Sequence, residues 1–112
     1  MHNIRFPVLL VYAGSDELLA LPDLPALQQF FAEPQLLVYG ADTLMDSAGQ
    51  QWNFDPQHRL SPTGRVWSLP EATALVQRHF FAQDQCCVSK IAAADLAALI
   101  ALVQQDAETN TH

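Results

Sequence analysis

One histidine and two cysteines, His79, Cys86 and Cys87, are the residues of this chain best suited to metal or redox chemistry. Zinc prefers thiolate and imidazole ligands, and thiols also carry redox chemistry. The cysteines are adjacent, however, whereas zinc and redox sites usually separate them by two or more residues. Neighbouring strand residues point to opposite faces, so both sulfurs cannot easily face one ion. We therefore expect no metal and no cofactor, with a structural histidine and one packed cysteine. The alternative is a small-ligand, metal or unrecognised catalytic site in this neighbourhood.

Four carboxylates, Asp16, Glu17, Asp42 and Asp46, are the next candidates. Paired carboxylates can bind Ca²⁺ or divide acid and base roles between them. The calcium loop of an EF-hand, Asp-x-Asp-x-Asp-Gly, is not present around Asp42 and Asp46. Asp46 stands three residues before Gly49, an order typical of a residue that starts a turn. Asp16 and Glu17 fall in another expected turn.

Motifs of nucleophilic and phosphate chemistry are missing from the sequence. No serine stands in a Gly-x-Ser-x-Gly elbow, and there is no Gly-x-Gly-x-x-Gly or Gly-Lys-Ser/Thr phosphate loop. Lys90 is the only lysine. The sequence therefore favours a non-catalytic domain that binds or regulates another protein, with no residue assigned a catalytic role.

Short strands and amphipathic helices must position these side chains. Turn residues between apolar runs predict two hairpins, and Ser68 with Glu71 forms a capping-box pattern at the start of a helix. An alternative to the first hairpin is a short helix capped by Asp16. Strands are expected at 6–12, 17–21, 43–46, 51–54, 86–91 and, less regularly, 36–39; helices at 24–32, 69–82 and 95–105; and a loop at 55–65.

This order of elements predicts an α+β domain of two layers. The sheet is antiparallel or mixed, with about four or five strands, because hairpins are antiparallel by construction. About three helices are expected on one of its faces. The expected core contains Leu9, Val11, Leu27, Phe31, Leu44, Trp52, Val76, Phe80, Leu96, Ile100 and Val103.

Composition limits the class of protein. The chain has 112 residues, 50% of them hydrophobic, and a formal net charge of −7. This predicts one globular domain at 1–106 with a frayed tail at 107–112. The negative charge argues against partners such as nucleic acid and anionic membranes. With no segment of 18 apolar residues and no disulfide framework, we expect a cytoplasmic protein, a monomer or weak homodimer.

Several segments resemble a family of short gammaproteobacterial proteins classed as a domain of unknown function. They are Phe6-Pro7, Gly14-Ser15-Asp16-Glu17-Leu18, Asp42-Thr43-Leu44-Met45-Asp46-Ser47-Ala48-Gly49 and Cys86-Cys87-Val88-Ser89-Lys90. The resemblance covers most of the chain. It implies a bacterial, intracellular, single-domain protein and assigns no reaction, ligand or catalytic residue.

The distribution of charge indicates what kind of partner to expect. Arg5 is the only Lys or Arg among the first 56 residues, whereas seven acidic residues lie there. If the two hairpins pair side by side, their turns would gather Asp16, Glu17 and Asp46 at one rim of the sheet. Such a rim would attract a protein partner with a basic contact face, although solvation of the turns explains the same charges.

Overall fold

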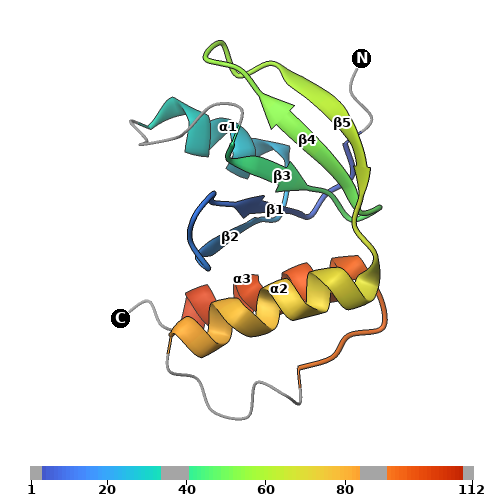
Figure 1. Cartoon of the computed structure of the whole chain (residues 1–112). Coiled ribbons are helices and arrows are strands. Elements are labelled where there is room, and N and C mark those ends of the chain that lie inside the picture. The colour runs from blue at the N-terminus through green and yellow to red at the C-terminus, as the bar shows by residue number, and fades with distance from the viewer. Residues whose placement is uncertain (1–3, 34–40, 84–90, 110–112) are drawn as a thin grey trace.

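The computed structural model describes residues 4–33, 41–83 and 91–109. Five strands form one antiparallel sheet in the order β2-β1-β3-β4-β5. Three helices lie within these described ranges (Figure 1). The elements are β1 Val8–Val11, β2 Leu18–Leu21, α1 Leu24–Ala32, β3 Thr43–Met45, β4 Gln50–Phe54, β5 Leu60–Val66, α2 Leu69–Ala82 and α3 Leu96–Thr109. The predicted α+β class with an antiparallel sheet is confirmed.

The sheet separates two hydrophobic cores because alternate residues of β1 face opposite sides. Leu9 packs in a core with residues of α2 and α3, among them Val76 and Ile100. Val8 and Leu10 pack in the other core with Leu27 and Phe30 of α1. Figure 1 shows α2 and α3 together on one side of the sheet. We expected all helices on one face; instead α1 covers the opposite face, because the central strands are apolar on both sides.

The predicted starts of α1 and α2 are confirmed by the capping hydrogen bonds at these positions. Asp23 accepts a hydrogen bond from the Ala26 amide at 2.9 Å, as an N-cap does. Ser68 and Glu71 form both bonds of the capping box. Both predicted hairpins are present. Every residue of the expected core is either buried in one of the two cores or packed against one of them. Helix α3 extends beyond the expected end near residue 105, to Thr109.

The expected loop at 55–65 is wrong, because most of it forms the edge strand β5. The carbonyl of Arg59 accepts from the amide of Asp55 at 3.2 Å, which closes the β4–β5 hairpin. Pro62 and Gly64 lie inside β5, where one partner strand is enough and a shift of register occurs. The strands expected at 36–39 and 86–91 lie outside the described residues, except for Ile91, which is not in a strand.

Candidate functional site

His79 lies on α2 with its side chain against the turn between β1 and β2, and it is 4% exposed. Its Nδ1 is 3.2 Å from the amide nitrogen of Leu18 and 3.2 Å from the carbonyl oxygen of Asp16. Next to it on α2, Arg78 Nε lies 3.7 Å from Asp16 Oδ1. The fold thus brings His79 beside Asp16 and Glu17, residues that no sequence motif connects.

A cavity of about 290 Å³ adjoins this contact, lined by Ser15, Glu17, His79 and the end of α2. When Nδ1 accepts the Leu18 amide, the neutral ring carries its proton on Nε2. Among the described residues, no group of three or more His, Cys, Asp or Glu side chains is arranged to hold a metal ion. Cys86 and Cys87 lie outside the described residues, so their role beside His79 stays a prediction.

Asp46 is 1% exposed and organises the β3–β4 turn. Its Oδ1 accepts from the amides of Ala48 and Gln50, both at 2.9 Å. Its Oδ2 accepts from Trp52 Nε1 at 3.0 Å and from the Arg5 amide at 3.3 Å. Four N–H donors satisfy the oxygens of the buried carboxyl group, so Asp46 is a structural anchor of the turn that the sequence predicted it to start.

Asp42 is also buried, but it lies at the opposite end of β3. Its Oδ1 accepts from the Ala13 amide at 2.7 Å, just after β1. Burial raises the pKa of the neighbouring Tyr12 hydroxyl, and the charges of Glu17 and Asp42 raise it further. Asp42 and Asp46 therefore do not form one paired site.

The expectation of a single acidic rim is also wrong. β1 and β3 pair antiparallel, with Val11 opposite Thr43 and Leu9 opposite Met45. The turns that follow β1 and β3 consequently lie at opposite ends of the sheet. The turn after β1 carries the exposed Asp16 and Glu17, whereas Asp46 is buried at the other end.

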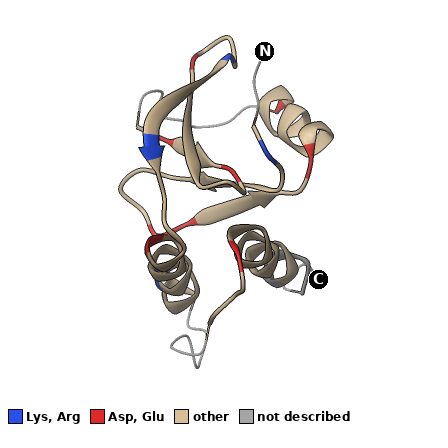
Figure 2. Ribbon diagram, turned by 90° about the vertical axis from the view of Figure 1, so that its right-hand side faces the viewer, with Lys and Arg blue, Asp and Glu red and all other residues tan. Residues whose placement is uncertain are grey.

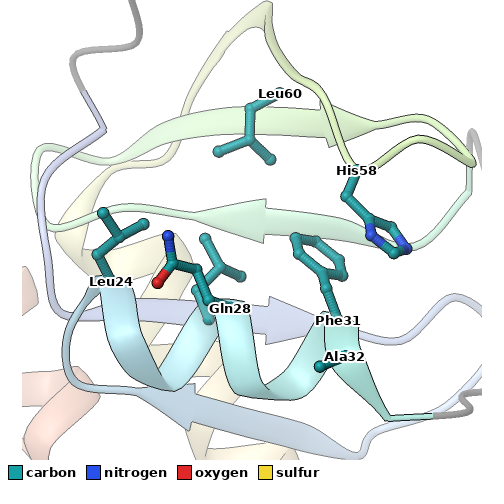
Figure 3. A pocket seen from close by; sticks show the side chains of 7 residues that line it. Leu24, Gln28, Phe31, Ala32, His58 and Leu60 are labelled. Carbon is teal, nitrogen blue, oxygen red and sulfur yellow. The ribbon is translucent and has the colours of Figure 1, made fainter.

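A larger cavity, about 520 Å³, lies between α1 and the β4–β5 turn. We call it the α1 groove. In Figure 3, Leu24, Gln28, Phe31 and Ala32 line it from the helix, and His58 and Leu60 line it from the hairpin. Leu27 completes the lining. Leu24 is 48% exposed although it is a large apolar residue.

One end of the α1 groove is formed by two stacked rings. The His58 and Phe31 rings are nearly parallel, at 4°, with centroids 4.4 Å apart. Phe31 is in turn 5.4 Å from the ring of Phe54 in β4. These contacts join the helix to the hairpin and give the groove an aromatic end.

The turn that carries His58 is held by Asp55. Asp55 Oδ1 accepts from the amides of Gln57 and Arg59, both at 2.9 Å, and Oδ2 accepts from Arg59 Nε at 3.1 Å. The backbone hydrogen bond from Arg59 is the main cause that lowers the pKa of the Asp55 carboxyl. His58 has a φ of 65°, in the left-handed region, and its amide donates to the Asp55 carbonyl at 2.7 Å. This tight turn directs the imidazole toward α1 (Figure 3).

Residues 6–103 match the model of a family, DUF4144, described as a protein structure with unknown function. The chain belongs to this family. The resemblance drawn from the sequence motifs is thereby confirmed. This DUF4144 domain is similar in fold to a protein from Shewanella amazonensis solved by NMR, with a TM-score of 0.74 and 24% sequence identity, over 94% of this chain and 91% of that chain. No curated protein matches it in sequence.

None of the helices in the described part of the DUF4144 domain has the length and apolar character needed to cross a bilayer.

Sequence reasoning missed the α1 groove in this DUF4144 domain. A signal was nevertheless present, because Leu24, Leu27, Gln28 and Phe31 follow i, i+3, i+4, i+7 spacing on one side of α1. Only Leu27 and Phe30 of this helix are buried. The apolar sector of α1 is therefore wider than the face that the core uses. The opposite wall cannot be predicted from the sequence, because the pattern at 55–65 indicates a loop and the hairpin that carries His58 forms only through pairing of β5 with β4.

Proposed function

We propose that this domain is a non-catalytic protein-binding module that holds an apolar side chain of its partner in the α1 groove. The groove itself carries the proposal: it is open, predominantly apolar and lined by Leu24, Leu27, Phe31 and Leu60. Concave apolar sites of about 300–1,000 Å³ with a few polar groups are typical of ligand and side-chain binding. Gln28 and His58 supply such polar groups here.

The composition of the groove supports binding more than catalysis. Its described lining includes no Ser, Thr, Cys, Lys, Asp or Glu that could act as a nucleophile or as an acid–base partner of His58. The nearby carboxylate, Asp55, is engaged by the backbone and side chain of Arg59. His58 therefore acts in this proposal as an aromatic wall and hydrogen-bonding group.

Selection of peptides from a displayed random library on the immobilised full chain tests the proposal. Selected peptides should bind the Leu24→Gln variant at least about fivefold more weakly, because one exposed apolar contact is lost. Phe81→Gln is the matched control, since Phe81 is a 63% exposed apolar residue on another helix. Peptides whose affinity is unchanged by Leu24→Gln, or is lowered by Phe81→Gln, would contradict binding in the groove.

A small-ligand site at the His79 cavity is the second candidate. The observation that favours it is the cavity of about 290 Å³ beside a buried imidazole and the carboxylate of Glu17. The test is an NMR titration of the full chain with a library of small polar molecules, which monitors the His79 ring. Shifts confined to His79 and the turn 15–17, and lost in Glu17→Gln, would support this candidate. If the chemical shifts of the His79 ring do not change during the titration, this second candidate is contradicted.

A further inference from the structure

No Asp, Glu, Lys or Arg is among the described residues that line the α1 groove, but three of the four such residues close to its lining in sequence, Asp23, Glu33, Asp55 and Arg59, are acidic. Helix α1 contains no charged side chain, and Asp23 and Glu33 stand directly before and after it (Figure 2). On the hairpin side, Arg59 is the basic residue between Asp55 and Leu60, and its Nε lies 3.1 Å from Asp55 Oδ2. The basic group is therefore paired with a carboxylate. Asp23 and Glu33 are exposed at the helix ends, where Asp23 Oδ1 accepts from the Ala26 amide and Glu33 Oε1 accepts from Gln29 Nε2 at 3.1 Å, and neither forms an ion pair with another described residue.

These surroundings restrict which protein segment can occupy the groove. We propose that the α1 groove binds a segment of another protein that carries one aromatic or leucine-like anchor flanked by Lys or Arg. This inference rests on the proposed function and names the class of partner. The anchor would lie between Phe31 and Leu60, and the flanking cations would lie near the two ends of α1.

The walls of the groove account for the anchor. Phe31 and His58 present aromatic surface at one end, and Leu24, Leu27 and Leu60 present aliphatic surface along the rest. Aromatic and aliphatic side chains gain free energy by leaving water for such a surface, and ring pairs add a further contribution. The exposed Gln28 amide can both donate to and accept from the backbone of a bound peptide.

Charge also separates this occupant from a second copy of the chain. Two copies would each carry a net charge of −7, so the approach of one to the acidic surroundings of the other is unfavourable. A basic segment is attracted by the same carboxylates, which raises its encounter rate. The groove therefore suits a basic heterologous partner.

Three fluorescent synthetic peptides of equal length test the proposal with the full chain. The first has a central Phe flanked by two Lys on each side, the second replaces the Lys by Glu, and the third replaces the Phe by Ser. We expect the first to bind at least about tenfold more tightly than either other peptide at low salt, and its affinity to fall as salt rises.

Charge-neutral variants locate the contact. Asp23→Ser keeps a good N-cap while it removes the charge, and Glu33→Gln removes the other. Together the two substitutions should lower the affinity for the Lys-flanked peptide by about threefold to tenfold, because two favourable charge contacts are lost. Asp16→Asn with Glu17→Gln is the matched control at the β1–β2 turn and should change affinity little.

The outcomes separate the two proposals. If the Glu-flanked peptide binds as tightly as the Lys-flanked peptide and Leu24→Gln weakens both, the groove binds an anchor but the basic partner is wrong. If the Phe and Ser peptides bind alike, both the basic-partner proposal and the proposed function of the groove are contradicted. Weakening by the Asp16 and Glu17 control alone would move the contact to the β1–β2 turn. A dimer in sedimentation that Leu24→Gln dissociates would show that the occupant is a second copy, and would overturn the proposal.

Discussion

Trp52 Nε1 donates a hydrogen bond of 3.0 Å to Oδ2 of Asp46, inside the domain. Trp52 also packs in the core beside α1, so this bond joins that core to the β3–β4 turn. A buried carboxylate is tolerated only when its lone pairs are satisfied, and here four N–H groups do so.

Replacement of Asp46 should therefore be costly. Asp46→Asn places an NH₂ group against backbone donors, and we expect the free energy of unfolding to fall by about 2–4 kcal/mol. Urea denaturation followed by tryptophan fluorescence measures the loss. Asp23→Ser, which keeps a cap at an exposed position, should change the midpoint far less. Equal effects of the two variants would show that the Asp46 network contributes little.

Gly49 is predicted to tolerate no side chain. Its φ is +87°, and a Cβ there would meet the carbonyl oxygen of Trp67, a backbone atom held by the bond from the Trp67 amide to Gly49 O at 2.7 Å. Gly49→Ala should lower the unfolding free energy by more than about 3 kcal/mol, through strain and overpacking together. Gly14→Ala is the control, because Gly14 has a φ of +72° but open space around it. Its loss should be about 1–2 kcal/mol in thermal or urea unfolding. Similar losses would contradict the steric argument.

The capping box predicts that the stability of the fold depends on pH. The hydrogen bond with the Ser68 backbone, and then the one with its side chain, lower the pKa of the Glu71 carboxyl below its usual value of 4.5. The charge of Arg65 lowers this pKa slightly more. A carboxyl whose pKa is lower in the folded state stabilises the fold above its unfolded pKa and loses that contribution as pH falls through the folded pKa. The difference in urea midpoint between wild type and Glu71→Gln should therefore be greatest at pH 6–7 and shrink below about pH 4.5. A difference that stays constant down to pH 3 would contradict the role of the charged Glu71.

The exposed edge β5 is predicted to resist pairing with other chains because of Pro62. The Arg59 carbonyl faces β4, and backbone groups alternate along a strand, so the backbone at 60 and 62 faces outward. Proline supplies no donor there. Pro62→Thr adds one, and we expect association that increases with protein concentration in sedimentation velocity. Ser61→Thr is the control in the same strand, since its amide already faces β4. If Pro62→Thr remains as monomeric as Ser61→Thr, the edge is protected by something other than Pro62.

Much of the fold could be predicted because its signals are local. The hairpins, the Asp23 cap and the Ser68–Glu71 box depend on residues within a few positions of one another. β5 could not be predicted in this way, since Pro62 and Gly64 oppose a strand and only pairing with β4 overrides them. The placement of α1 was readable in principle: Val8–Val11 and Leu18–Leu21 are continuous apolar runs, which is typical of strands buried on both faces.

The candidate sites depended more on tertiary structure. His79 and Asp16 are 63 positions apart, so their contact follows from the docking of α2 on the sheet. The α1 groove needs two walls distant in sequence, and only the stripe on α1 was visible. Asp46 was read correctly as a turn residue, but the sequence does not show that its carboxylate also reaches Arg5 and Trp52.

The two buried carboxylates at the ends of β3 have a consequence for β1. Because β1 is apolar on both faces, sliding it by one position would still bury apolar side chains, and hydrophobicity alone resists such slippage weakly. Asp46 binds the Arg5 amide before β1, and Asp42 binds the Ala13 amide after it. Together they fix the length of chain between these points and hence which leucine enters which core. Insertion or deletion of a single residue between Arg5 and Ala13 would break one of these bonds, so natural variation in length is expected outside this interval.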